Sequence, residues 1–557
     1  MRIKLRLASL LVALAGCGQP VLGVSVQLVT KACPGAAANG SRNPVLGVDT
    51  LTFTISGDGL TTTSSDVNFT TGVLQIPNLP VGTNRRIVVV ACVAAAPAGG
   101  AARSCSTPGS RTRSRADSGL FDATGSAAVH LTLFLRVLDA FTATGNADGT
   151  TCTRMTTPRA GHALTLLPDG RVLVSGGFSL DSSSQLHYHD DAEIFDPATA
   201  SFTAFMPAPS LRRSGHSALP VQMGTSGPGI LLAGGEGPID ASGSGTAAPI
   251  KPFELFSGGL WSTVQLPAQT AAREHQAAAV DLKTGDALIV GGQSGSDAAN
   301  GVSFFSDAAY FEPRSGAVHA ISSPLRAGPL TDAVAVARAN VKQGVSIGGV
   351  VLVGGRNASG ASTQLSGLFF EDVSARDYLD DADYRHLALP RALVHHVAVR
   401  TRDDRVLVAG GLTVAPAVAG ADYSNASSFV TLIDPAAQTV ADLPGSQQLS
   451  LARADSCAAV LQDGGVLIIG GAWKDTANHS STAVDFIGTD GSVRPLLGAG
   501  IPAGASWELH DARHRAACVR LNDGSVLVTG GLQFPAVGSA ATVLDSAEIY
   551  MPIGAAK

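Results

Sequence analysis

Seven pairs of adjacent glycines between residues 176 and 531 recur at a regular spacing, and each of them follows a short apolar segment. Successive pairs lie about 60 residues apart, which is a period typical of repeat architectures. Such a repeat is one small unit that cannot bury its apolar face alone and buries it on its neighbours. The pairs are Gly176-Gly177, Gly234-Gly235, Gly291-Gly292, Gly354-Gly355, Gly410-Gly411, Gly470-Gly471 and Gly530-Gly531.

Each repeat predicts a sheet of four strands. In the first copy, residues 162–167 and 171–175 have strand character and flank a Pro-Asp-Gly turn. An aromatic third strand follows at 192–197, and a weaker fourth strand at 202–204. The last copy ends after its third strand, while residues 140–146 resemble a fourth. We therefore expect residues 140–146 to complete the seventh sheet, which removes an exposed edge.

This pattern of apolar strand, double glycine and aromatic third strand resembles the Kelch repeat. The resemblance covers residues 139–557 and implies a seven-bladed Kelch β-propeller in an all-β chain. The family includes galactose oxidase-like copper enzymes, whose site needs two His and two Tyr, one of them crosslinked to Cys. The chain has 6 Tyr and one adjacent histidine pair, His395-His396, so we expect no copper, no other metal and no cofactor.

The N-terminus resembles a bacterial lipoprotein signal. Basic residues precede the apolar stretch Leu7–Ala13, which is too short to cross a bilayer. Leu14-Ala15-Gly16-Cys17 then matches the lipobox. The resemblance implies that residues 1–17 are a signal peptide with a lipid anchor on Cys17, which makes the membrane one partner. We expect a lipid-anchored location in the bacterial cell envelope, at the outer membrane because Gly18 follows the cysteine.

Residues 22–138 lack the repeat and contain short predicted strands separated by turn residues. This pattern predicts a small β-sandwich, and residues 79–90 loosely resemble Ig-like or fibronectin-like modules. We interpret this domain as a spacer that precedes the propeller. A carbohydrate-binding module is the alternative, although no cluster of aromatic residues favours it.

Cysteine pairing is only partly predictable. Cys33, Cys92, Cys105 and Cys152 lie in the first 152 residues, and an exported chain can form disulfides. We favour a Cys92–Cys105 bridge and leave the other pairings open. Cys457 and Cys518 lie 13 and 12 residues before their glycine pairs, which predicts opposite faces of their strands. We therefore expect both to be buried free thiols.

An arginine opens every repeat, and the seven residues form the candidate ligand site. A ring of guanidinium groups at one end of the propeller channel suits an anionic ligand. The alternative is that each arginine pairs inside its own blade. The histidines at 162, 216, 275 and 395 follow these arginines, and we interpret them as repeat residues. The arginines are Arg159, Arg213, Arg273, Arg326, Arg391, Arg453 and Arg513.

The remaining features point to binding more than to catalysis. A net charge of −6 without a basic run argues against nucleic acid. No Gly-x-Ser-x-Gly elbow or sialidase-type Asp box occurs, so we expect no enzyme but a binding or scaffolding module with a protein or glycan partner. Two alternatives stay open. One is a galactose oxidase-like or glycan-acting enzyme. The other is a structural envelope protein stabilised by Ca²⁺ at the acidic segments 181–191 and 371–386.

Overall fold

The computed structural model describes most of the chain. The described residues are 21–30, 43–69, 75–96, 102–124, 129–143, 145, 151–238, 247–268, 270–294, 302–321, 325, 328–339, 341–342, 345–346, 348–357, 359, 361–364, 366–372, 377–380, 387–415, 422–496, 508–534 and 541–553.

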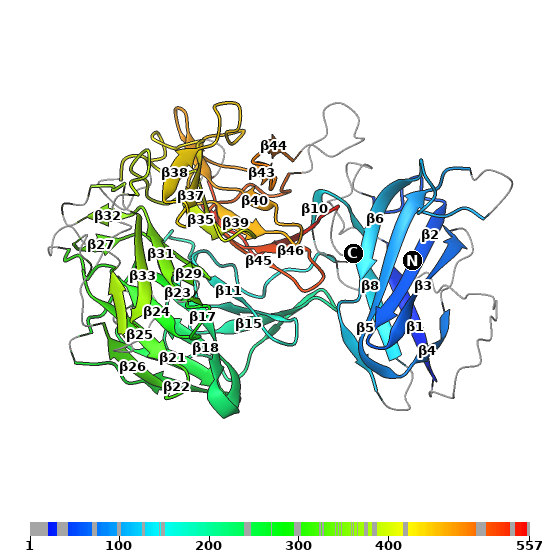
Figure 1. Cartoon of the computed structure of the whole chain (residues 1–557), viewed down its shortest axis with the longest axis horizontal. Coiled ribbons are helices and arrows are strands. Elements are labelled where there is room, and N and C mark those ends of the chain that lie inside the picture. Colours follow the sequence, from blue (N-terminus) through cyan, green and yellow to red (C-terminus); the bar gives the residue numbers. More distant parts are fainter. Residues whose placement is uncertain are drawn as a thin grey trace.

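The described part of the chain is all-β and contains no α-helix. It includes the short 3₁₀ turn Gly224–Ser226. Among these residues, no helix has the length and apolar character that a membrane crossing requires. The strands fall into two groups, and Figure 1 shows the blue and cyan strands of the N-terminal part beside the sheets formed by the rest of the chain.

Seven four-stranded antiparallel sheets follow one another from residue 140 onward. In strand order they are β11 (Ala163–Leu166), β12 (Val172–Ser175), β15 (Ala192–Asp196) and β16 (Ser201–Ala204); β17 (Ser217–Met223), β18 (Gly227–Ala233), β21 (Phe253–Ser257) and β22 (Leu260–Val264); β23 (Ala277–Val280), β24 (Ala287–Val290), β25 (Ala308–Glu312) and β26 (Ala317–Ala320); β28 (Val334–Ala337), β31 (Val350–Val353), β33 (Ser366–Asp372) and β34 (Asp377–Asp380); β35 (Val397–Arg400), β36 (Val406–Ala409), β37 (Val430–Asp434) and β38 (Thr439–Asp442); β39 (Cys457–Val460), β40 (Val466–Ile469), β43 (Val484–Ile487) and β44 (Val493–Pro495); and β45 (Ala517–Arg520), β46 (Val526–Thr529), β49 (Ala547–Met551) and β10 (Ala140–Ala143).

The last sheet joins the two ends of the repeat region. β10 pairs antiparallel with β49 and places Phe141 opposite Tyr550, which confirms the predicted closing strand. The first strands of successive sheets contact one another from β11 to β45, and β45 contacts β11. The row of sheets therefore returns to its starting point, and no sheet edge is left unpaired at β49.

The second strand of each sheet explains why the sheets stack. All four residues of β12 are buried, as are those of β24, β31, β36, β40 and β46. Strands buried on both faces are apolar throughout and do not alternate with polar residues. The apolar clusters span neighbouring sheets, so each sheet buries both faces on the next ones. This packing is what the double-glycine repeat predicted.

Five short two-stranded sheets lie next to the glycine pairs. In each of them, one strand begins directly after a glycine pair. They are β13 (Phe178–Leu180) with β14 (Leu186–Tyr188), β19 (Glu236–Pro238) with β20 (Ala247–Pro249), β27 (Leu330–Thr331) with β32 (Arg356–Asn357), β41 (Ala472–Lys474) with β42 (Asn478–Ser480), and β47 (Leu532–Gln533) with β48 (Thr542–Val543). They add a second layer at the glycine end of the ring.

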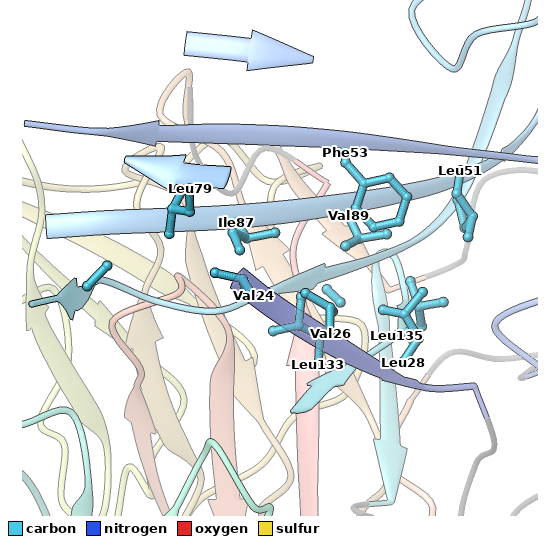
Figure 2. Close-up of a cluster of buried hydrophobic side chains, with 13 residues drawn as sticks. Val24, Val26, Leu28, Leu51, Phe53, Leu79, Ile87, Val89, Leu133 and Leu135 are labelled. Atoms are coloured by element: carbon cyan, nitrogen blue, oxygen red, sulfur yellow. The ribbon is translucent and has the colours of Figure 1, made fainter. Parts of the chain in front are cut away.

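The N-terminal part consists of two sheets that share one apolar core. The smaller has the order β4 (Gln75–Pro80), β1 (Val21–Val29) and β8 (Val129–Phe134); the larger has the order β3 (Leu60–Asn68), β2 (Thr50–Gly57), β5 (Gly82–Val93), β6 (Arg111–Asp117) and β9 (Arg136–Val137), with β7 (Phe121–Ala123) paired to β5. Figure 2 shows Val24 and Val26 of β1 facing Ile87 and Val89 of β5. Alternate residues of these strands point to the core, as the period of two requires.

The disulfides correct one prediction and confirm another. Cys92 and Cys105 are bonded, as expected. Cys457 and Cys518 are also bonded, with a Cα–Cα distance of 6.0 Å, so the prediction of two free thiols is wrong. The alternation rule holds within one sheet, whereas β39 and β45 belong to neighbouring sheets that are twisted relative to each other. Cys152 is disulfide-bonded as well, while Cys17 and Cys33 lie outside the described residues.

Candidate functional site

Five of the seven predicted arginines lie in the interior of their own sheets. Arg213 is 1% exposed, donates to Glu254 of the third strand at 2.8 Å and to the carbonyl of Gly234 at 2.9 Å. Arg513 does the same with Glu548 and Gly530. Arg159 pairs with Glu193 and Asp191, Arg273 with Asp307, and Arg453 with Asp485. The guanidinium groups thus tie each third strand to the segment before the first strand.

These five arginines therefore make the intra-sheet pairing that was the alternative to a ligand ring. Arg391 pairs with Asp442 and stacks 3.7 Å above the Phe429 ring. Arg326 lies outside the described residues. The same holds for the side chains of the acidic segment 371–386. In the segment 181–191, Asp190 pairs with Arg212 and Asp191 with Arg159.

The repeats converge at a different position, just before the first strand of each sheet. One residue there has a left-handed backbone in all seven repeats, with φ between 50° and 63°. Five of these residues are not glycine, and such strained positions cluster at functional sites. The seven residues, which we call the axial ring, are Gly161, Gly215, His275, Asp332, His395, Asp455 and Arg515.

Backbone hydrogen bonds link the members of the axial ring. The N–H of Asp332 donates to the carbonyl of His275 at 3.0 Å, and the N–H of Asp455 donates to His395 at the same distance. Arg515 donates to Asp455, Gly161 to Arg515, and Gly215 to Gly161. Neighbouring repeats therefore bring these residues side by side around the centre of the ring of sheets. Gly215, His275 and Arg515 are exposed, so the axial ring is open to solvent.

Basic and acidic side chains alternate along five members of the axial ring. His275 Nδ1 lies 2.6 Å from Asp332 Oδ1, and His395 Nδ1 lies 2.8 Å from Asp455 Oδ1. Arg515 Nε donates to Asp455 Oδ2 at 3.3 Å. The order is imidazole, carboxylate, imidazole, carboxylate, guanidinium. The two glycines occupy the remaining positions and leave that side of the axial ring without side chains.

Two residues of the second layer support the carboxylates. Arg356 of β32 forms an ion pair with Asp332. The hydroxyl of Tyr423 donates to Asp455 at 2.6 Å. Both aspartates are thus held by groups from outside the axial ring, which fixes their orientation.

The electrostatic environment keeps the charges of the axial ring in place. The His275 side chain is 38% exposed, but the surrounding protein partly desolvates it and favours its neutral form. The charge of Asp332 and the hydrogen bond to it outweigh this desolvation and raise the His275 pKa. Burial likewise opposes ionisation of Asp332, yet His275 and Arg356 lower its pKa overall. The pKa of Asp455 is held well below its usual range by His395 and Arg515, again against the effect of burial. Opposite charges at this distance favour both ionised forms.

A buried acid adjoins this arrangement. Glu274 is 1% exposed, and its Oε1 accepts from Gln293 at 2.9 Å. Its Oε2 has no hydrogen-bond partner among the described residues, and burial raises its pKa. Tyr188 is also buried, and burial and the neighbouring Glu236 raise the pKa of its phenol. Unpaired buried polar groups are costly, so the free oxygen of Glu274 needs a ligand or an ordered water to complete its hydrogen bonds.

Sequence reasoning misassigned two histidines of this site. His162 and His216 are buried and bond to Thr529 and Ser175 of the neighbouring sheet, as repeat residues would. His275 lies one position earlier in its repeat than His162 does in the first repeat. The position equivalent to His162 is occupied by Gln276. In the fifth repeat the buried position is His396, and His395 belongs to the axial ring. The interpretation of His275 and His395 as repeat residues is therefore wrong.

No protein-family model matches the sequence, and no curated relative matches it. Two solved structures are similar. A structure of YjhT has 14% identity and a TM-score of 0.43, over 61% of this chain and 98% of that one. A structure of a fungal alcohol oxidase of the AA5 family, in complex with copper, has 13% identity and a TM-score of 0.46, over 73% and 78%. At this level the likeness concerns the course of the chain and carries no argument about substrates.

The expectation that the chain is no enzyme needs correction. We inferred it from missing motifs, but one of the two similar structures is an alcohol oxidase. A fold of this kind therefore gives no ground for excluding catalysis. The motifs that we searched for belong to other enzyme classes, and their absence says nothing about acid–base groups such as Glu274.

The described residues do not fit the copper in that oxidase. No group of three or more His, Cys, Asp or Glu among them could hold a metal ion. His275 and His395 each face an aspartate, and the hydroxyl of Tyr423 donates to Asp455. Cys457 and Cys518 are bonded to each other, so neither can crosslink to a tyrosine. We derive no chemistry through copper.

Proposed function

We propose that the chain is a seven-bladed Kelch-type propeller that acts on a carbohydrate at the axial ring by acid–base chemistry. The observation that carries this proposal is the position of Glu274, a buried acid with one unpaired oxygen, directly before His275 in the axial ring. An acid with a raised pKa beside an imidazole supplies a proton donor and a proton acceptor in one site.

The composition of the site supports a hydroxyl-rich, uncharged substrate. Arg356 and Arg515 donate hydrogen bonds, Asp332 and Asp455 accept them, and Glu274 does either according to its protonation. Cations and anions alternate, so the site has no large excess of either sign. A sugar, whose hydroxyls both donate and accept, matches such a surface. Gly161 and Gly215 have no side chains and leave room for the sugar beside the other five members of the axial ring.

The proposed mechanism assigns a role to each residue. Glu274 gives the proton on Oε2 to the ring oxygen of a reducing sugar, while the neutral form of His275 takes the proton of the anomeric hydroxyl. The bond between C1 and the ring oxygen breaks, a C1=O bond forms, and the reverse transfer restores both groups. Asp332 orients the imidazole and stabilises the imidazolium that forms in this step. The Glu274 carboxyl is desolvated, which keeps it protonated closer to neutral pH than an exposed glutamate.

The test is a substrate screen with a matched pair of variants. Purified protein is incubated with neutral mono- and oligosaccharides, and NMR follows any change in the sugars. Glu274→Gln should lower the rate by about a hundredfold, the typical effect of losing a general acid. Glu312→Gln is the control, because Glu312 ends β25 of the same sheet and bonds to Ser315. Failure to convert any sugar, or equal rates for both variants, would contradict the proposal.

We also propose that a lipid on Cys17 anchors the chain at the outer membrane of a bacterial envelope, and that residues 22–138 form an Ig-like or fibronectin-like spacer for the propeller of residues 139–557. The lipobox supports the anchor, and the shared core of the two N-terminal sheets supports the spacer. Cys17→Ala should move the protein from the membrane fraction to the soluble fraction. If this variant stays with the membrane, the anchor is elsewhere.

A further inference from the structure

A cleft of about 380 Å³ separates the N-terminal sheets from the ring of sheets. Arg136 of β9 lines it on one side, and Asp523, in the turn between β45 and β46, lines it on the other. Its volume is within the range of small-molecule sites, which often lie between domains. The axial ring contributes no residue to this cleft, so it is a separate site.

Arg136 lacks the partner that a buried cation needs. The residue is 8% exposed, and it makes no hydrogen bond or ion pair with any described residue. Its guanidinium carbon lies 5.3 Å from the centre of the Phe134 ring. Burial lowers the pKa of Arg136 to about 10, so the group remains charged at neutral pH. A buried charge without a partner is strongly unfavourable unless a ligand or solvent completes it.

The neighbouring arginines show that this is a particular feature of Arg136. Arg86 and Arg115 both donate to Asp117, at 2.7 Å each. Arg171, which also lines the cleft, donates to Asp169 at 2.8 Å. Every one of these cations is thus matched by a carboxylate. Arg136 differs because its guanidinium faces the cleft.

Asp523 presents a free acceptor on the opposite wall. Its Oδ1 accepts from the N–H and the hydroxyl of Ser525, whereas Oδ2 bonds to no described residue. Burial raises the pKa of Asp523, and the charge of Arg136 acts on it, but the two groups form no ion pair. An unpaired donor and an unpaired acceptor therefore line the same cleft.

We propose that this cleft binds a small organic acid whose carboxylate pairs with Arg136 and whose hydroxyl or ammonium group donates to Asp523. A guanidinium binds a carboxylate through two parallel hydrogen bonds. A dianion such as phosphate is disfavoured, because Asp523 and Asp117 lie in the cleft wall. A ligand with one negative charge and a donor at its other end satisfies both unpaired groups.

Calorimetric titration of the full-length protein with four probes tests this proposal. Glycolate and glycine carry a carboxylate and a donor, acetate lacks the donor, and glycerol lacks the carboxylate. We expect glycolate or glycine to bind more tightly than acetate, and glycerol not to compete. Arg136→Met should weaken the binding by roughly tenfold to a hundredfold, the effect of losing a charged hydrogen bond. Asp523→Asn should reduce the preference over acetate.

The controls separate binding from folding. Arg171→Met removes a cleft arginine that already has a partner and should leave the affinity unchanged. Arg136→Met should fold as well as the wild type, because it removes a buried unpaired charge; circular dichroism checks this. Arg136→Lys keeps the positive charge but loses the planar guanidinium that forms two parallel hydrogen bonds. This variant should bind glycolate with intermediate affinity. The proposal would be overturned if the wild type and Arg136→Met bound glycolate equally well. It would also be overturned if glycerol bound as tightly as glycolate, or if none of the carboxylates bound.

Discussion

His275 Nδ1 lies 2.6 Å from Oδ1 of Asp332, and the two residues come from neighbouring repeats. The backbone N–H of Asp332 also donates to the carbonyl of His275, at 3.0 Å. The two residues therefore join two sheets and place an imidazole and a carboxylate at the centre of the ring of sheets. The same relationship recurs two sheets further on between His395 and Asp455. The repeat thus builds both the scaffold and the candidate site.

The first prediction concerns pH. The pKa of His275 is higher in the folded chain than in the unfolded chain, so folding is coupled to proton binding. The stabilisation is fully present below the unfolded value of about 6.5 and is lost as pH rises through the folded value. His275→Gln should therefore lower the melting temperature more at pH 6 than at pH 9. Differential scanning calorimetry at both pH values measures this difference.

A second histidine variant serves as the control for that experiment. His479 of β42 pairs with Asp475, whose side chain is 52% exposed, whereas the side chain of Asp332 is 7% exposed. Exposed pairs contribute little to stability. His479→Gln should lower the melting temperature by a similar, small amount at both pH values. If His275→Gln behaves in the same way, the His275–Asp332 pair does not stabilise the axial ring.

The second prediction concerns the disulfide between β39 and β45. Cys457 and Cys518 lie 61 residues apart, whereas Cys92 and Cys105 lie 13 apart. In the chain-entropy description, a bridge that closes a longer loop restricts the unfolded chain more. Replacing Cys457 and Cys518 by serine should cost about 4 kcal/mol of unfolding free energy. Replacing Cys92 and Cys105 should cost about 3 kcal/mol.

Urea unfolding of the two double variants, followed by circular dichroism, measures both values. Tryptophan fluorescence follows the ring of sheets, because Trp261 and Trp473 lie on β22 and β41. The Cys457 and Cys518 variant should shift this transition, and the Cys92 and Cys105 variant should leave it nearly unchanged. A ring transition that is insensitive to the loss of Cys457 and Cys518 would show that the bridge does not restrict unfolding.

How much the sequence predicts depends on whether a feature repeats. The glycine pairs and apolar second strands occur in every copy, and the four-stranded sheets follow from them. The axial ring is harder to find, because its residue type changes from repeat to repeat. Two residues after the arginine stand Gly161, Gly215, His275, Asp455 and Arg515. The available signal is a position at a constant distance after the arginine whose residue type varies between glycine and charged residues.

Two features of the site could not be read from the sequence. In the fourth repeat Asp332 is six residues after Arg326, and in the fifth His395 is four residues after Arg391, so the spacing of the other five repeats fails in both. The pairing of His275 with Asp332 depends on how neighbouring sheets twist, which local patterns do not fix. The bond between Cys457 and Cys518 escaped prediction for the same reason. Contacts between repeats, unlike contacts within them, needed the structure.

The third prediction concerns the glycine pairs. Gly176 has a φ of 58°, a conformation that residues with a Cβ adopt at a cost. A Cβ built on Gly176 would also lie 2.4 Å from the carbonyl oxygen of Arg213, which belongs to the next repeat. Gly176→Ala should therefore destabilise the fold by about 1 kcal/mol from the backbone and by about 1–3 kcal/mol from overpacking.

Gly258→Ala separates the two contributions. Gly258, in the turn between β21 and β22, has a φ of 60°, and a Cβ there would meet nothing within 4 Å. This variant should lose only the backbone contribution of about 1 kcal/mol. Urea midpoints of the two variants then give the packing cost as their difference. If Gly176→Ala is no less stable than Gly258→Ala, the close approach between repeats does not explain why the glycine pairs recur.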